Sequence, residues 1–250
     1  MSAKFEELGW SDTPIGEVAL RRRIDPVTKL DIFEVKLNDE WLMSSQFTAA
    51  EEELARLGLA LLASKTHASG SAAPDAPGTL DVVVGGLGLG YTARTALEDV
   101  AVRELVVVEL LDPVIDWHRR GLVPVGPTLT GDTRCRLQQG DFFAMSYGEG
   151  YDPAQPGRLF DAVLLDIDHS PSHLLADGSA GFYGVDGMRA VASHLKPGGV
   201  YAMWSNDPPE EAYLAILRDV FVNVAAEVIT FPNPLQGREA TATVYVATRG

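Results

Sequence analysis

The chain has 250 residues, of which 46% are hydrophobic and 22% are charged, and its formal net charge is −15. This length can bury a full core in one large domain or in one domain with a small appendage. Basic residues do not cluster beyond Arg21 to Arg23, so nucleic acid and anionic membrane surfaces are not expected as partners. The acidity either attracts cationic substrates or serves solubility alone.

The chain also shows no sequence signal for export or membrane insertion. No apolar run approaches the length of a membrane span, and the start MSAKFEELGW lacks the basic and apolar regions of a secretory signal. The single cysteine, Cys135, cannot form an internal disulfide and is interpreted as a small buried residue. These features predict a cytoplasmic protein.

Residues 1–50 predict a small antiparallel β meander. Strand-like runs at 16–23, 30–37 and 41–45 are separated by turn signals. The exposed edges of such a meander would suit a contact in a homodimer.

Residues 51–79 predict a helix followed by a flexible connector. Thr48 and Glu51 have the spacing of a capping box, and leucines recur on one face of the following helix. Residues 63–80 are rich in alanine, serine, glycine and proline and have no apolar period, so we expect an exposed connector there.

Residues 80–250 alternate between strand and helix signals. Nearly continuous apolar runs, typical of parallel strands covered on both faces, alternate with helical patterns, and two further strand runs close the chain. This alternation predicts a doubly wound, mostly parallel α/β sheet, in which ligands bind at the carboxyl ends of the strands. The strand runs lie at 81–86, 104–110, 133–139, 160–168, 199–205, 224–231 and 241–249, and the helices at 92–99, 113–120, 185–195 and 209–221.

A glycine-rich loop follows the first of these strands. Gly86, Gly88 and Gly90 are spaced as GxGxG before a helix whose free N–H groups would face a ligand. Alone this pattern is a weak signal, because dinucleotide-binding proteins use the related GxGxxG.

Acidic residues at the ends of the following strands strengthen the interpretation. Glu109 lies where a carboxylate can accept both ribose hydroxyls. Asp141 could accept a hydrogen bond from an adenine amino group, with Phe142 against the adenine ring. Asp166, with its neighbour Asp168, ends the fourth strand. Any one of these could be a helix cap, but together they favour an adenosine-bearing ligand.

The motifs GGLGLGYTART, VVELLDPVIDW, QQGDFF and FDAVLLDIDHSP together resemble those of the polyamine aminopropyltransferases, the spermidine synthase family. The resemblance implies a seven-stranded Rossmann-like methyltransferase sheet with a small N-terminal β domain. It also implies that S-adenosylmethionine or its decarboxylated form is the cofactor, and that the acceptor is a small amine, possibly a polyamine.

The resemblance also implies roles for individual residues. Glu109 corresponds to the ribose-binding glutamate of the family, and Asp141 to its adenine-binding aspartate. Asp166 matches the aspartate that holds the amine of the transferred aminopropyl group. His169 occupies the position of the family's proton-accepting aspartate, so Asp168 is the candidate base.

Two departures from the family affect recognition of the amine. Leu89 stands where the family's glycine loop carries an aspartate that grips the aminopropyl amine. The family's tyrosine-histidine-glutamate signature is replaced by the acidic run Glu51 to Glu53. Both departures affect polyamine and aminopropyl recognition, whereas the nucleoside contacts remain. With Leu89 in place of the aspartate, discrimination against ordinary S-adenosylmethionine is weaker.

The resulting hypothesis is a transferase that uses an S-adenosyl nucleotide to alkylate a small, amine-bearing acceptor, with Asp166 and Asp168 as catalytic residues. Two alternatives remain: a class I methyltransferase acting on a small molecule, and an inert nucleotide-binding module. Asp168, His169 and His173 lack the further spaced ligands of a metal site, so no metal is expected.

Overall fold

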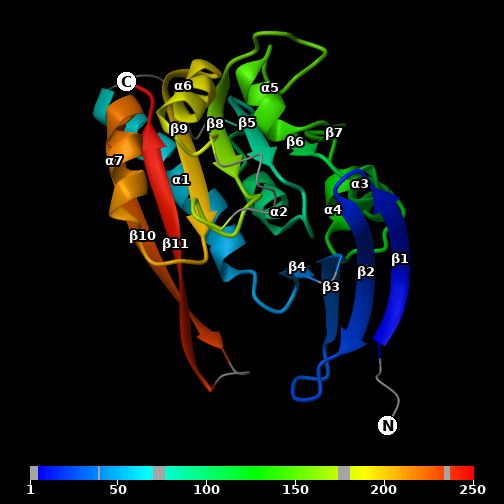
Figure 1. Cartoon of the computed structure of the whole chain (residues 1–250). Coiled ribbons are helices and arrows are strands. Elements are labelled where there is room, and N and C mark those ends of the chain that lie inside the picture. The colour runs from blue at the N-terminus through cyan, green and yellow to red at the C-terminus, as the bar shows by residue number, and fades with distance from the viewer. Residues whose placement is uncertain (1–4, 39, 70–76, 174–180, 234–236) are drawn as a thin grey trace.

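The computed structural model describes residues 5–38, 40–69, 77–173, 181–233 and 237–250. These residues form a four-stranded antiparallel sheet and a seven-stranded sheet flanked by helices (Figure 1). The predicted α/β class, with a mostly parallel seven-stranded sheet and a small N-terminal antiparallel sheet, is confirmed. Within the described ranges, no helix combines the length and the hydropathy that crossing a membrane requires.

The N-terminal sheet packs one face on the rest of the protein. Val18 and Leu20 are fully buried on that face, whereas Trp10 on the other face is 49% exposed. A Cβ on Gly9 would lie 2.3 Å from the indole Nε1 of Trp117, which shows how closely the two parts meet. The strands pair in chain order: β1 Phe5–Thr13, which was not predicted, β2 Gly16–Ile24, β3 Asp31–Leu37 and β4 Glu40–Ser44.

Helix α1, Ala49–Ser69, begins directly after Thr48, as the capping signal predicts. The Thr48 hydroxyl donates to Oε1 of Glu52 at 3.0 Å, so Glu52 rather than Glu51 is its side-chain partner. The helix continues into the segment predicted as a connector, and that prediction was wrong for residues 63–69. Residues 70–76 of the predicted connector lie outside the described residues.

The large sheet has the strand order β10-β11-β9-β8-β5-β6-β7. Strands β5 to β9 run parallel, and β11 is antiparallel to both β9 and β10. The order reverses between β5 and β8, where ligands bind in sheets of this kind. The strands are β5 Leu80–Gly85, β6 Val102–Glu109, β7 Cys135–Gln139, β8 Phe160–Leu165, β9 Leu195–Ser205, β10 Val222–Asn233 and β11 Arg238–Thr248.

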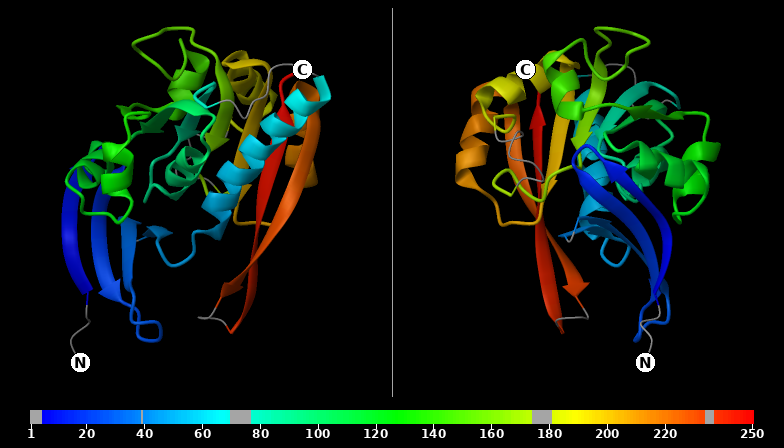
Figure 2. Two further views of the ribbon diagram at one scale, coloured as in Figure 1. Left: turned by 180° about the vertical axis from the view of Figure 1, so that it is seen from behind. Right: turned by 45° about the vertical axis from the view of Figure 1, so that its right-hand side comes forward.

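Helices cover both faces of this sheet and enclose two separate apolar cores. In β5, Val82 and Val84 face one core whereas Val83 faces the other, as alternation along a strand requires. Figure 2 shows α1 from behind, lying across β9 and β11. The first core includes residues of α1, α2 Tyr91–Glu98, α3 Asp112–Arg119 and α4 Gly126–Gly131; the second includes α5 Phe142–Tyr147, α6 Val185–Ser193 and α7 Glu211–Val220.

The carboxyl ends of the parallel strands face the start of α1. In Figure 1 the four-stranded sheet and the β10–β11 hairpin both extend beyond this lower edge, and α1 begins between them. Phe47, just before α1, and Phe231 of β10 have ring centroids 6.1 Å apart, so the hairpin contacts the segment that leads into α1. This edge therefore collects groups from distant parts of the chain.

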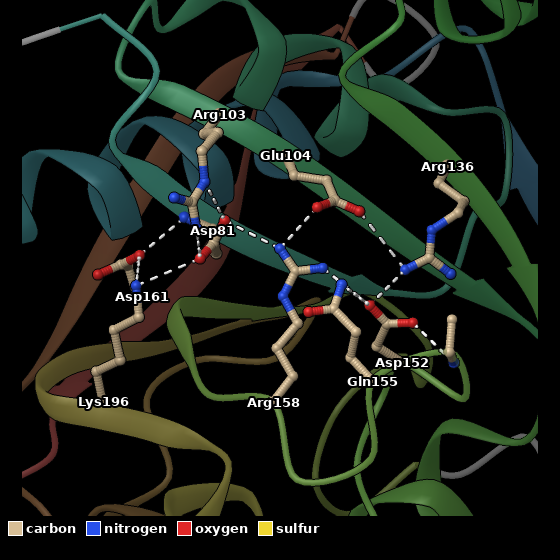
Figure 3. A network of polar contacts seen from close by, with 10 residues as sticks. Asp81, Arg103, Glu104, Arg136, Asp152, Gln155, Arg158, Asp161 and Lys196 are labelled. Carbon is tan, nitrogen blue, oxygen red and sulfur yellow. Dashed lines mark hydrogen bonds and ion pairs between the residues drawn. The ribbon is translucent and has the colours of Figure 1, made fainter.

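The opposite edge, where the parallel strands begin, carries a network of ion pairs (Figure 3). The Arg158 guanidinium lies 2.8 Å from the Glu104 carboxylate, 2.9 Å from that of Asp152 and 3.0 Å from that of Asp81. Each buried charge of this network has a partner, as burial requires. The other members are Arg103, Arg136, Asp161 and Lys196.

Candidate active site

The glycine loop joins β5 to α2 and touches the end of β8. Gly86, Gly88 and Gly90 have φ angles of 93°, 49° and 91°, which side chains rarely allow. A Cβ on Gly86 would lie 2.0 Å from the carbonyl oxygen of Asp166, and one on Gly90 would lie 2.8 Å from Leu129. The protein's own packing therefore already demands glycine at two of these positions.

Glu109 ends β6 beneath this loop and is 9% exposed. Its Oε2 accepts from the Leu87 N–H at 2.9 Å, and its Oε1 accepts from the Leu111 N–H at 2.8 Å. Burial raises the pKa of Glu109, and these backbone donors oppose the rise. The carboxylate thus holds the loop in place next to the expected ribose site.

Asp166 follows β8 and is fixed from two sides. Its N–H donates to the Gly85 carbonyl at 2.7 Å, and its Oδ2 lies 2.5 Å from the Thr92 hydroxyl. Burial raises the pKa of Asp166 to about 6; the Thr92 hydroxyl and the Trp204 indole lower it, whereas the charge of Glu109 raises it further. A carboxyl group with this pKa can exchange a proton near neutral pH.

Glu51, in the first turn of α1, reaches the same place. Its carbonyl oxygen lies 3.2 Å from the Thr92 hydroxyl that also contacts Asp166. Burial and the negative charge of Asp166 together raise the pKa of the Glu51 carboxyl to about 8. The neighbouring Glu52 instead pairs with Arg94 at 2.7 Å. The structure therefore brings together Glu51 and Asp166, residues from opposite halves of the chain.

Sequence reasoning missed two of these contributors. Glu51 was treated as part of an acidic run that had lost the family signature, and Thr92 was not considered. The sequence did hold a signal for Thr92, because it is the second residue of the helix that follows the glycine loop. It therefore lies at the edge of the sheet where the parallel strands end. The sequence holds no comparable signal for Glu51, whose position depends on how α1 packs on the sheet.

Asp141 and Phe142, predicted to contact adenine, have different surroundings. Asp141 is exposed, and its Oδ1 accepts from the N–H groups of Phe143 at 2.9 Å and Ala144 at 3.1 Å at the start of α5. Phe142 is 2% exposed and stacks on Tyr151 with ring centroids 4.6 Å apart. The structure encloses the Phe142 ring in the second core, and its contact with adenine remains a prediction.

Asp168 lies deeper than Asp166. It is 1% exposed, and the Tyr183 hydroxyl donates to its Oδ2 at 2.6 Å. The adjacent His169 accepts from the Asn206 N–H through its carbonyl oxygen at 2.7 Å. In the part of the chain that the structure describes, no group of three or more histidine, cysteine, aspartate or glutamate side chains is arranged to hold a metal ion.

Leu89 contributes no charge to the site. Its side chain is 4% exposed and belongs to the first core together with Leu87. Below the loop, Nε2 of the fully buried His118 lies 2.9 Å from the carbonyl oxygen of Gly88. The loop is therefore anchored by core side chains and by His118, and the acidic groups of the site come from other elements.

Comparisons with known proteins point to one family. No protein-family model matches the chain. Over 163 residues the chain is 31% identical to polyamine aminopropyltransferase 2 of Pseudomonas aeruginosa, a match that covers 61% of this chain and 43% of that protein. The chain thus spans less than half the length of this curated relative.

Solved structures share the fold at lower identity. Spermidine synthase from Thermotoga maritima has a TM-score of 0.66 at 16% identity, covering 98% of this chain and 73% of its own. A probable spermidine synthase from Corynebacterium glutamicum has a TM-score of 0.59 at 18% identity, with coverage of 96% and 79%. Human methyltransferase-like protein 13, solved with SAH, has a TM-score of 0.54 at 18% identity, with coverage of 80% and 82%. The chain therefore resembles the polyamine aminopropyltransferases in sequence and has the class I methyltransferase-like fold of the spermidine synthases.

Proposed function

We propose that this protein is an aminopropyltransferase that uses decarboxylated S-adenosylmethionine to alkylate a small amine. The observation that carries the proposal is the position of Asp166, a half-buried carboxyl group with a pKa of about 6 beside the glycine loop. Such a group can hold an ammonium or receive a proton from an amine. The sequence relative favours this activity over the methyltransferase and inert-module alternatives.

The donor and acceptor groups at the site fit an S-adenosyl ligand. Glu109 offers carboxylate oxygens for the ribose hydroxyls, and Asp141 offers one for the adenine amino group. A Cβ on Gly88 would lie 3.0 Å from Sδ of Met43, so a side chain at this position would crowd Met43 of β4. Asp166 supplies negative charge for the cationic tail of the ligand.

The proposed reaction transfers one alkyl group to nitrogen. The lone pair of the acceptor amine forms a bond to the methylene carbon next to the sulfonium, the carbon–sulfur bond breaks, and its electron pair stays on sulfur as a neutral thioether. The new ammonium loses a proton, and the products are the aminopropylated amine and 5′-methylthioadenosine. The protein contributes by orienting the reactants and by accepting the proton.

Two carboxyl groups after β8 have separate proposed roles. Asp166, fixed by Thr92 and Gly85, orients the ammonium of the aminopropyl group or the incoming amine. Asp168 accepts the proton, and its hydrogen bond from Tyr183 keeps it oriented. The high pKa of Tyr183, which burial and the charge of Asp168 raise well above the ordinary value, keeps this hydroxyl protonated as a donor.

The test incubates the full chain with decarboxylated S-adenosylmethionine and a panel of diamines and polyamines and measures 5′-methylthioadenosine. We expect product with at least one amine, and a loss of about 10²- to 10⁴-fold in kcat/KM for Asp166→Asn. Unchanged turnover in Asp168→Asn would remove that residue as the base. Formation of S-adenosylhomocysteine from ordinary S-adenosylmethionine would indicate methyl transfer instead. If neither compound gave a product, the proposal that the protein is a transferase would be contradicted.

A further inference from the structure

The glycine loop offers no carboxylate for an ammonium group, because Leu89 is enclosed in the first core. Asp166 alone would then face the cationic tail of the ligand. A single carboxylate distinguishes poorly between an ammonium and the zwitterionic end of an amino acid. A second negative group at this place would change the selectivity of the site.

Glu51 is placed to supply that group. Thr92 contacts both residues, with its hydroxyl 2.5 Å from Oδ2 of Asp166 and 3.2 Å from the carbonyl oxygen of Glu51. The start of α1 and the end of β8 therefore meet at one side chain of α2. After burial, the negative charge of Asp166 is the next contribution to the raised pKa of Glu51.

The other acidic residues of this helical turn are already neutralised. Glu52 lies 2.7 Å from Arg94 and 3.0 Å from Arg56, and Glu53 lies 2.9 Å from Arg56. Among the described side chains, no lysine, arginine or histidine forms an ion pair with Glu51 or Asp166. The neighbouring acids are thus paired, whereas Glu51 and Asp166 have no cation beside them among the described residues.

A buried donor beside the pair is also incomplete. The indole Nε1 of Trp204 is shielded from solvent and has no hydrogen-bond partner among the described residues. It is nevertheless close enough to Asp166 to lower the pKa of that residue. Buried polar groups are normally hydrogen-bonded, so this N–H is a further polar group available to a ligand beside two carboxyl groups that have no cation among the described residues.

We propose that Glu51 and Asp166 form a two-carboxylate clamp for the primary ammonium of the aminopropyl donor, with Glu51 in the role that Leu89 cannot fill. The clamp rests on the proposed function, since it assumes an S-adenosyl ligand at the glycine loop. It favours a donor whose tail ends in an ammonium alone. A donor that also carries a carboxylate meets two negative groups and is repelled.

Binding measurements with three nucleosides test the clamp: decarboxylated S-adenosylmethionine, ordinary S-adenosylmethionine and 5′-methylthioadenosine, which has no ammonium. In calorimetry on the full chain, Glu51→Gln should lower the affinity for the decarboxylated compound by about 10- to 100-fold. The affinity for 5′-methylthioadenosine should change little. The preference for the decarboxylated over the ordinary compound should shrink in the same variant. The matched control is Glu53→Gln, since Glu53 lies two residues further along α1 and is already paired with Arg56. This variant should change none of these affinities.

A second measurement follows the proton that leaves Glu51 when the ligand binds. Because the pKa of Glu51 is about 8, this group is largely protonated at neutral pH, and a bound ammonium favours its ionised form. Binding of decarboxylated S-adenosylmethionine should therefore release up to about one proton, seen as a dependence of the binding enthalpy on the ionisation enthalpy of the buffer. Binding of 5′-methylthioadenosine should release close to none, and Glu51→Gln should abolish the release.

The outcomes separate the clamp from the proposed function. If 5′-methylthioadenosine binds but Glu51→Gln leaves the affinity for the decarboxylated compound unchanged, the clamp is wrong and the proposed function stands. Equal weakening of both ligands by Glu51→Gln would indicate a structural role and would also overturn the clamp. If none of the three nucleosides binds the wild-type protein, both proposals fail.

Discussion

The hydroxyl of Thr92 lies 2.5 Å from Oδ2 of Asp166. The same hydroxyl lies 3.2 Å from the carbonyl oxygen of Glu51, so the two acceptors compete for its one proton. When Asp166 is ionised, Thr92 donates to it; when Asp166 is protonated, it can donate to Thr92, which then donates to Glu51. Thr92 therefore couples the ionisation of Asp166 to the first turn of α1.

Thr92→Val removes a donor that lowers the pKa of Asp166. We expect the acid limb of the pH profile of kcat to move upward by about 0.5 to 1 pH unit, since one hydrogen bond contributes about 1 kcal/mol. Thr95→Val is the control one turn further along α2, because the buried Thr95 hydroxyl has no partner among the described residues. An unchanged profile in Thr92→Val would argue against this coupling.

The raised pKa of Glu51 makes the stability of the protein depend on pH. Its pKa rises from 4.5 to about 8 on folding, so between these values the folded state binds more protons than the unfolded state. The contribution of Glu51 is fully present below pH 4.5 and is lost as the pH rises through about 8. The slope is at most about 1.4 kcal/mol per pH unit for one proton.

Urea unfolding across this pH range should therefore show a flatter dependence for Glu51→Gln than for the wild type. The half-buried, ion-paired Glu53 provides the control, and Glu53→Gln should keep the wild-type slope. Parallel curves for the wild type and Glu51→Gln would mean that Glu51 is ionised in the folded protein.

His118→Leu should weaken both the fold and nucleoside binding. Burial lowers the pKa of His118, so its neutral ring donates from Nε2 to the Gly88 carbonyl. Loss of this contact should cost about 1 to 3 kcal/mol of stability and should weaken 5′-methylthioadenosine binding because the loop loses an anchor. His194 makes the same kind of contact, 2.9 Å from the carbonyl oxygen of Ser146, in the second core. His194→Leu should lower the melting temperature without changing the affinity.

Arg158→Met should destabilise the protein while leaving substrate binding intact. The Arg158 side chain is 9% exposed, and its removal leaves the buried Asp152 and Asp81 with fewer partners at the edge opposite the site. We expect a loss of about 3 to 5 kcal/mol in the free energy of unfolding, with KM unchanged. Arg103, whose side chain is 58% exposed, also contacts Asp81, and Arg103→Met should cost below about 1 kcal/mol. Equal losses in the two variants would contradict the importance of burial.

The central strands and their acidic ends were predictable from the sequence for a physical reason. Strands buried on both faces appear as continuous apolar runs, so β5, β6 and β8 could be found, and with them Glu109 and Asp166. Strand β1 was missed because most of its residues are exposed or half-buried and its pairing shifts between Glu7 and Gly9. Helix α4 was missed because its six residues include two glycines and a proline.

The pairing of Glu51 with Asp166 could not be predicted from spacing. The capping-box pattern predicted that Glu51 would cap its own helix. In the structure it is Glu52 that contacts the Thr48 side chain. Which face of α1 meets β8 depends on the packing of the whole helix across the sheet. The sequence likewise does not reveal that Phe142 stacks on Tyr151 in the second core.

The contact between Gly9 and Trp117 has a consequence for how the protein is made. The four N-terminal strands leave the ribosome well before the segment that covers their buried face has been synthesised. Val18 and Leu20, fully buried in the finished protein, must then stay exposed to water while about a hundred further residues are added. Nascent chains arrested before α3 should therefore expose an apolar sheet face and bind chaperones. Chains arrested beyond α4 should expose much less of this face and bind chaperones less.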